Sequence, residues 1–141
     1  MAKVSGLGAA IAVDDASGTP QTITNDVTNF SITTPVALQD TTGVDKYAHE
    51  RLALLRDGTV SLNGVANWAA NMSHAVLSSV LTQAGAINRT TKVTPSAATV
   101  PYLSMELLYA SYNLTRANGG DLTWTAEGQL ADGTIPTWTN S

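Results

Sequence analysis

Residues 50–67 read ERLALLRDGTVSLNGVAN, and this stretch decides the fold class. The dipeptide Asp57-Gly58 separates two runs of alternating residues, which is the strongest short-range signal of a β-hairpin. A two-residue type I′ turn at this dipeptide pairs the residues on either side of it and sets which side chains share a face. One face is then fully apolar, and we expect it to pack on the core; it consists of Ala53, Leu55, Val60 and Leu62.

The opposite face of the predicted hairpin is mixed in character. It consists of Leu52, Leu54, Ser61, Asn63 and Val65. Three of these five side chains are apolar, which is unusual for a face that contacts water. The predicted hairpin therefore needs packing partners on both of its faces.

Weaker signals surround this stretch. Residues 21–24 and 27–33 alternate and predict strands. Residues 33–49 have no clean period and predict a long loop, which in a compact domain usually has a function. Residues 68–84 predict the one clear helix, with Asn67 or Asn71 as its N-cap and Gly85 in the left-handed position after its end. The apolar stripe of this helix consists of Met72, Val76, Leu77, Val80, Leu81 and Ala84.

A second, longer hairpin is predicted from residues 100–116 and 121–131, with Asn118-Gly119 as its turn. This register places Arg116 opposite Asp121 as a cross-strand ion pair. Its core-facing side chains are Met105, Leu107, Tyr109, Leu122, Trp124, Ala126 and Leu130. The other face of the last strand is a polar row of Asp121, Thr123, Thr125, Glu127 and Gln129. Residues 132–141 form a tail, and Trp138 predicts that this tail docks on the domain.

Length and composition favour a single mainly β domain with one flanking helix. The chain has 141 residues, and only 13% of them are charged, about half the usual share of a soluble domain. Such a surface suits burial in an assembly. The net charge of −4 and the scattered Lys and Arg residues disfavour nucleic-acid binding. No segment reaches the roughly 20 apolar residues of a membrane span, and we read the short apolar run near the N-terminus as an arm, residues 1–12, rather than as a signal peptide.

The sequence offers no constellation for catalysis, for a metal or for a cofactor. The chain has no cysteine. Its two histidines, His49 and His74, lack the spacing of a second ligand, and a metal needs three or four converging groups. No nucleophile-elbow motif is present, and GLGAA at 6–10 is not followed by a helix, as a dinucleotide fingerprint requires. We therefore expect a protein that is not an enzyme.

Three segments resemble the major tail (tail tube) proteins of long-tailed bacteriophages, especially siphophage-type phages of actinobacterial hosts. They are SITTPVALQDTTGVDKYAHERLALLRDGTVSLNGVAN at 31–67, NMSHAVL at 71–77 and YASYNLTRANGGDLTWTAEGQLADGTIPTW at 109–138. The resemblance spans roughly residues 10–140 and rests on the order and spacing of the motifs. The chain departs from the family pattern at Ala66, where an aromatic residue is expected, and we expect Trp68 to take over that packing.

The resemblance implies a β-sandwich or barrel with one flanking α-helix, in a single domain over 1–141. It implies hexameric rings that stack into a non-contractile tail tube, through which DNA passes without specific binding. The expected partners are further copies of the chain, the tape measure protein and the tail terminator protein, with no membrane contact. The expected location is the virion tail, assembled in the host cytoplasm.

On the hypothesis of a tail-tube subunit, we predict roles for particular residues. The polar row from Asp121 to Gln129 is expected to face the lumen or its rim. The mixed face from Leu52 to Val65 is expected to contact a neighbouring subunit or the flanking helix, so that both faces of the hairpin are at least half buried in an assembly. The N-terminal arm and the loop 38–50 are expected to join ring to ring; the loop residues are Gln39, Asp40, Asp45, Lys46, Tyr47 and His49. The alternative is a monomeric β-sandwich that binds carbohydrate or a cell surface, which requires exposed, co-planar tryptophans.

Overall fold

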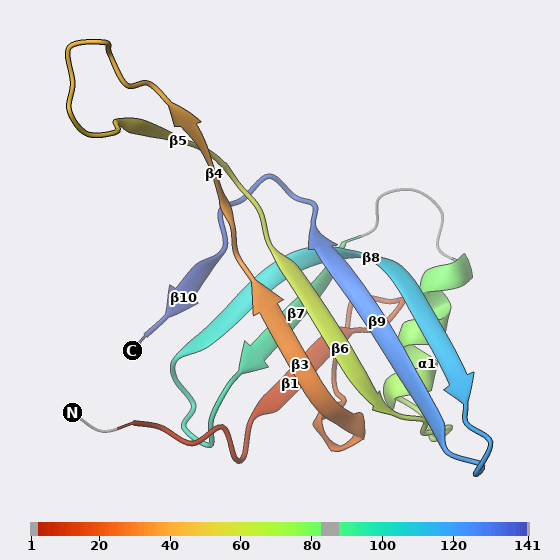
Figure 1. Cartoon of the computed structure of the whole chain (residues 1–141). Coiled ribbons are helices and arrows are strands. Elements are labelled where there is room, and N and C mark those ends of the chain that lie inside the picture. Colours follow the sequence, from red (N-terminus) through yellow and green to blue (C-terminus); the bar gives the residue numbers. More distant parts are fainter. Residues whose placement is uncertain (1–2, 83–87, 141) are drawn as a thin grey trace.

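The computed structural model describes residues 3–82 and 88–140. As predicted, the fold is mainly β with one flanking helix (Figure 1). The strands are β1 (Ala10–Asp14), β2 (Pro20–Thr22), β3 (Val27–Thr33), β4 (Val36–Asp40), β5 (Arg51–Arg56), β6 (Thr59–Val65), β7 (Arg89–Thr94), β8 (Tyr102–Arg116), β9 (Leu122–Leu130) and β10 (Thr137–Thr139). The helical segments are the 3₁₀ turn η1 (Thr24–Asp26), the α-helix α1 (Ser73–Leu77) and the 3₁₀ helix η2 (Ser78–Thr82).

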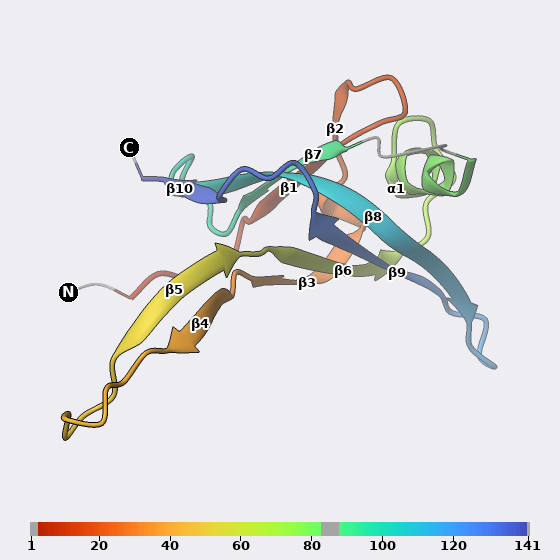
Figure 2. The ribbon, with the colours of Figure 1, turned by 90° about the horizontal axis from the view of Figure 1, so that it is seen from above.

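One antiparallel sheet folds into two layers because β8 is long enough to serve both. The strand order is β2-β1-β7-β8-β9-β6-β3, and β10 pairs with the start of β8. Residues 103–107 of β8 pair with β7, and residues 107–116 pair with β9. Figure 2 shows β1 and β7 in one layer with α1 beside them, and β3, β6 and β9 in the other.

The core lies between these two layers. Alternate residues of the strands point into it, and α1 adds two apolar side chains that are fully buried. Burying side chains of this size stabilises a fold by roughly 1.5–3 kcal/mol each relative to leaving them in water. The buried apolar residues are Ile11, Val13, Ile23, Val60, Leu62, Val76, Leu77, Val93, Leu103, Met105, Leu107, Tyr109, Trp124 and Ala126.

The hairpin predicted at Asp57-Gly58 is wrong. Strand β5 pairs with β4, whereas β6 pairs with β3 and β9. Gly58 does not adopt the positive φ that a type I′ turn requires. It is instead a point of close packing, because a Cβ on it would lie 2.8 Å from the Met105 sulfur. The chain runs on from β5 into β6, and the Asp57 amide donates to the Pro35 carbonyl at 3.0 Å.

The true hairpin is longer, and its tip lies within the segment predicted to be a loop. Strands β3 and β4 form one side, and β5 and β6 form the other. Residues 34–57, which we call the arm, project away from the two layers (Figures 1 and 2). Val60 and Leu62 are buried as predicted, but Ala53 and Leu55 lie on the arm and are exposed.

The second predicted hairpin forms, with a register that differs near its turn. Arg116 pairs with Leu122 rather than with Asp121, because Gly120 adopts a φ of 94° and the loop is longer than two residues. The predicted Arg116–Asp121 ion pair is therefore wrong. A bulge between Tyr109 and Ser111 shifts the register by one residue and so restores the predicted pairing beyond it. Met105, Leu107 and Tyr109 of β8 therefore face the core as predicted.

The helix is shorter than the predicted range 68–84, and Ala84 and Gly85 lie outside the described residues. Its N-terminus is not capped by Asn67 or Asn71. The cap is the buried carboxylate of Asp26, which accepts the Ser73 amide at 3.0 Å and the Asn67 side-chain amide at 2.9 Å. Asp26 thus connects the start of the helix to the 3₁₀ turn η1, a long-range contact that no local capping rule predicts.

Both ends of the chain join the sheet. The last residues of the predicted N-terminal arm belong to β1, which pairs with β7. The C-terminal tail docks as predicted, with Trp138 opposite Leu103 of β8.

Candidate assembly surfaces

One outer face of the sheet contains residues from both the predicted lumen row and the predicted inter-subunit face. In the register of β6 with β9, Asn63 lies opposite Thr125 and Ser61 lies opposite Glu127. Residues that lie directly opposite each other share a face of the sheet. Four members of the predicted lumen row lie on β9, and three members of the predicted inter-subunit face lie on β6. These two sets therefore form one surface. Asp121 precedes β9 and is exposed at the rim of this surface.

This surface, which we call the polar face, continues onto β3 and β8 through the same register. Hydroxyl and amide side chains dominate it, and Glu127 is the one charged member of the set. Because its groups are mostly neutral, this face carries little charge to attract a phosphate or a cation. Its members are Asn29, Ser31, Thr33, Thr59, Ser61, Asn63, Val65, Leu108, Ser111, Asn113, Thr115, Thr123, Thr125, Glu127 and Gln129.

The layer that carries the polar face has two open edges within the described residues. Strand β3 pairs only with β6, and residues 108–116 of β8 pair only with β9. A strand edge leaves a row of backbone N–H and C=O groups free to pair with another strand. Each of these two edges can therefore pair with a further strand.

The predicted inter-subunit face does not exist as one surface. It was expected to run across a hairpin turn, but the structure puts Leu52 and Leu54 on β5 of the arm. Ser61, Asn63 and Val65 remain on the polar face. The physical reason is the pairing of β5 with β4, which takes β5 out of the main sheet.

The arm exposes an unusual number of apolar side chains. All residues of β4 and β5 are exposed, and Leu55 keeps 85% of its surface open. At the arm tip, Val44 and Tyr47 are fully exposed. A two-stranded hairpin alone in water is only marginally stable, so a free arm of this composition lacks the packing that normally holds a strand pair.

The predicted ring-stacking residues gather near the tip of the arm, where a polar network orders the chain. The Asp40 carboxylate accepts the Thr42 amide at 2.9 Å and lies 3.1 Å from Nδ1 of His49. The Thr42 hydroxyl also contacts Asp40 and accepts the Glu50 amide at 2.8 Å. These bonds, led by the Thr42 hydroxyl, hold the pKa of Asp40 below its usual value. Lys46 bridges Asp45 at 3.6 Å and Glu50 at 4.0 Å.

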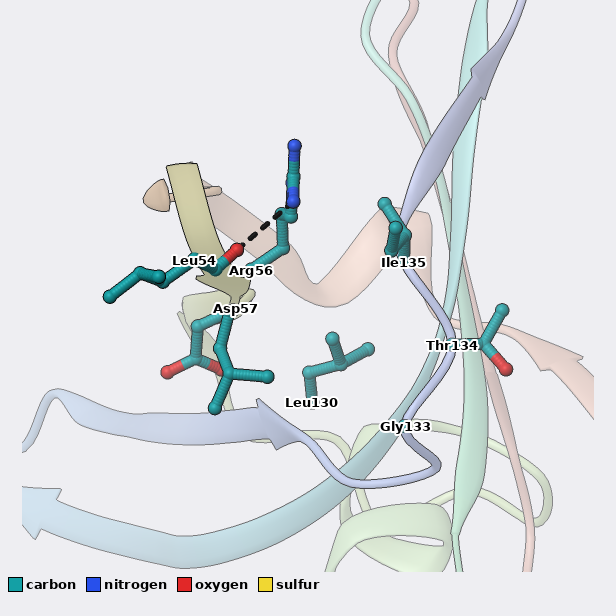
Figure 3. Close-up of a pocket in the computed structure, with 8 residues that line it drawn as sticks. Leu54, Arg56, Asp57, Leu130, Gly133, Thr134 and Ile135 are labelled. Carbon is teal, nitrogen blue, oxygen red and sulfur yellow. Dashed lines mark hydrogen bonds between the residues drawn. The ribbon is translucent and has the colours of Figure 1, made fainter. Parts of the chain in front are cut away.

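A groove of about 360 Å³ lies where the arm joins the body (Figure 3). The arm root forms one side of it, and the end of β9 with the segment that follows forms the other. The Arg56 guanidinium donates to the Leu54 carbonyl at 3.0 Å, and Asp57 accepts the Gly58 amide at 2.8 Å. Neither side chain forms an ion pair with another described residue. The lining residues are Leu54, Leu55, Arg56, Asp57, Leu130, Gly133, Thr134 and Ile135.

The tryptophans do not form the platform that a carbohydrate-binding module requires. Trp124 is 1% exposed, as its predicted core-facing position requires, and its indole donates to the Val65 carbonyl at 3.0 Å. Trp68 follows β6 and packs edge-on against His74, with ring centres 4.4 Å apart. Trp138 belongs to β10, which lies across the domain from the end of β6 (Figure 1).

The described residues contain no group of three or more His, Asp or Glu side chains placed to hold a metal. His49 lies at the arm tip, and His74 lies on α1 with its Nδ1 atom 3.0 Å from the Tyr112 hydroxyl. Within residues 3–82 and 88–140, no helix is long and apolar enough to cross a membrane.

Comparison with known proteins yields structural neighbours only. No protein-family model and no curated protein sequence matches the chain. A chain in the virion of a native gene transfer agent particle superposes with a TM-score of 0.75 at 15% identity, over 97% of this chain and 99% of that chain. A chain in the tail of an empty gene transfer agent particle with C6 symmetry superposes with a TM-score of 0.75 at 14% identity, over 99% of both chains. The chain therefore shares its whole fold with proteins of these two particles.

Proposed function

We propose that the chain is a structural, non-catalytic subunit of the tail tube of a phage or phage-like particle. The observation that carries this proposal is the likeness of fold to a chain from a tail with C6 symmetry, over nearly the full length of both chains. The tail-tube motifs of the sequence point in the same direction. They also favour a non-contractile tail of the siphophage type and an actinobacterial host.

Rings form by pairing of the two open edges. Strand β3 of one copy lies beside β8 of the next, and six copies close the ring. Edge pairing of this kind is a common way for strands from different chains to associate, because backbone hydrogen bonds supply the contact. The position of the edges on opposite sides of one layer supports a contact that repeats around a ring rather than a closed dimer.

The polar face lines the lumen or its rim. A protein that binds phosphates holds nucleic acid with an affinity that depends on salt, and such binding would impede the passage of DNA. A face of neutral hydroxyl and amide groups with the Glu127 carboxylate does not attract phosphates. Reversal of this charge tests the assignment: Glu127→Lys is expected to impair genome ejection more than assembly, and equal effects on both would contradict it. Thr99→Lys, in the exposed loop between β7 and β8, is the control for the addition of a surface lysine.

Rings stack through the arm tip and the N-terminal segment. In an assembly, both sides of the arm are then at least half buried. The further partners in the particle are the tape measure and tail terminator proteins, and the location is the virion tail after assembly in the host cytoplasm. The genes that neighbour the coding sequence would separate a phage from a phage-derived particle.

Electron microscopy of the purified protein over a range of concentrations tests the proposal. We expect stacked rings or tubes, and class averages along the tube axis that have six-fold symmetry. A protein that stays strictly monomeric at high concentration and forms no tubes, with no labelling of tails by specific antibodies, would contradict the proposal.

A further inference from the structure

The arm tip and the groove at the arm root have matching chemistry at opposite ends of the same arm. We infer that the tip of one copy inserts Val44 and Tyr47 into the arm-root groove of a second copy. This inference rests on the proposed function, which places many copies of the chain side by side. It goes further by naming the surface that receives the arm.

The tip presents two exposed apolar side chains on a backbone that hydrogen bonds hold in place. Val44 and Tyr47 lose none of their surface to their own chain. The backbone around them is held by the Thr42 hydroxyl, which joins Asp40 to the start of β5 through the Glu50 amide. An ordered segment loses less conformational entropy when it binds than a disordered one. The tip backbone is thus already ordered before it binds a second copy.

The groove matches this projection in its apolar character. Half of its eight lining residues are leucine or isoleucine, namely Leu54 and Leu55 from the arm root and Leu130 and Ile135 from the other side. Its volume of about 360 Å³ lies at the lower end of the range for pockets that enclose a ligand. Leu55 and Ile135 are both more than half exposed at its walls, so a side chain that enters the groove removes apolar surface of both partners from water.

Charges at the two sites are complementary. Asp45 and Lys46 lie between the two apolar tip residues, and Arg56 and Asp57 lie at the edge of the groove. Asp45 of one copy can meet Arg56 of the next, and Lys46 can meet Asp57. The present bridges of Lys46 to Asp45 and Glu50 are exposed, and exposed ion pairs are weak. Exchange of these bridges for pairs with a second copy therefore costs little.

The contact has to join different copies. The tip and the root are separated by the paired strands β4 and β5, so the tip does not reach the groove of its own chain (Figure 2). A contact between two different surfaces of identical chains repeats from copy to copy and generates rings or filaments. This property fits the stacked rings of the proposed tube.

Disulfide trapping tests the contact, because the chain has no cysteine of its own. The variant carries Tyr47→Cys and Ile135→Cys in one chain, and both sites are exposed surface positions. After mild oxidation of the assembled protein, we expect a ladder of cross-linked species on a non-reducing gel. The two single-cysteine variants are the controls: each alone should give few cross-links, and a mixture of the two should give dimers only.

The outcomes separate this inference from the proposed function. Tubes that form without a ladder would overturn the tip-to-groove contact and leave the tube proposal standing. Failure of the unmodified protein to form rings or tubes would instead overturn the tube proposal. A second variant pairs Val4→Cys with Ile135→Cys. If this pair cross-links and the pair of Tyr47→Cys with Ile135→Cys does not, the groove receives the N-terminal segment, and the inference is overturned. A ladder that passes six supports contact between rings, whereas one that stops at six supports the contact within a ring.

Charge reversal gives a second test that needs no cross-link. Asp45→Arg and Arg56→Asp are each expected to raise the concentration needed for assembly by about tenfold, as for the loss of a partly desolvated charge pair. The double variant restores opposite charges and is expected to assemble near the original concentration. Failure of the double variant to recover, with the circular dichroism spectrum unchanged, would contradict the pairing.

Discussion

Strands β5 and β6 follow each other in the chain, and both combine apolar with polar side chains. They differ in burial. In β6, Val60 and Leu62 are fully buried. In β5, every residue is exposed, and Leu55 keeps 85% of its surface open. The difference comes from their partners: β6 has β3 and β9 beside it and a second layer over it, whereas β5 has only β4. Apolar alternation therefore predicts a strand, but it does not predict which strands pair with it or whether its own chain buries it.

The largest expected difference between body and arm concerns their glycines. A Cβ on Gly64 of β6 would lie 2.0 Å from the Asp26 carbonyl oxygen and 2.6 Å from the Trp124 ring. Gly64→Ala should therefore destabilise the fold by about 3 kcal/mol or more, because backbone and a buried indole both have to move. In the arm, a Cβ on Gly43 meets only the exposed Asp45 side chain, which has room to shift, so Gly43→Ala should change the free energy of unfolding by less than about 0.5 kcal/mol. Urea denaturation of both variants measures the difference, and a tolerated Gly64→Ala would contradict the packing described for β6.

Leucine truncations sharpen the same comparison. Leu62→Ala should lower the free energy of unfolding of the monomer by about 2–5 kcal/mol, the cost of a cavity in a packed core. Leu55→Ala should cost less than about 0.5 kcal/mol in the monomer, since Leu55 packs on little of its own chain, but should weaken assembly. Thermal denaturation below the assembly concentration provides the first readout, and light scattering above it provides the second. Similar stability losses for the two variants would show that the arm is packed on its own body.

Only part of this arrangement could be predicted from the sequence. Local alternation placed Trp124 in the core and the Thr123–Gln129 row on the outer face correctly, because a strand alternates its faces whatever its partner. The partner of β5 could not be predicted, because pairing with β4 depends on contacts across the chain. The groove at the arm root was missed for the same reason, since it joins the arm to residues 130–135.

Buried polar groups set a second limit on sequence reasoning. Arg89 is 1% exposed, and its guanidinium donates to the Val76 carbonyl at 2.7 Å and to the Ser79 hydroxyl at 2.8 Å. Burial lowers its pKa. No local pattern predicts these contacts, because Arg89 lies on β7 whereas Val76 lies on α1 and Ser79 lies on η2. The same applies to Asp26, which contacts an amide 47 positions away.

A smaller effect is expected at the Asp26 cap, which belongs to the body and has no counterpart in the arm. Asp26→Ala leaves the Ser73 amide and the Asn67 side-chain amide without their acceptor, and should cost about 1–3 kcal/mol. Asp26→Asn keeps one acceptor oxygen and should cost less. Amide exchange at Ser73 and the midpoint of urea unfolding measure both. An Asp26→Ala protein as stable as the original would rule out the cap as a significant support of α1.

The smallest expected effects are acid titrations, which compare one carboxylate of the body with one of the arm. The Ser17 hydroxyl and further hydrogen bonds lower the pKa of Asp15 from 3.8 to about 2. The Thr42 hydroxyl lowers that of Asp40. A lowered folded-state pKa means that these bonds contribute stability above the unfolded value of 3.8, and that the contribution is lost as the pH falls through the folded value. Carboxyl carbon shifts measure both, with Ser17→Ala and Thr42→Val expected to raise the pKa of their respective partners; unchanged midpoints would contradict the proposed cause.

Hydrogen exchange in the monomer and in the assembled protein compares the two regions most directly. We expect the amides of β4 and β5 to exchange rapidly in the monomer and to become protected at least tenfold in the assembly, because a second copy then covers the arm. The amides of Val60 and Leu62 should be protected in both states. Arm amides that exchange equally fast in monomer and assembly would contradict the claim that other copies complete the packing of the arm.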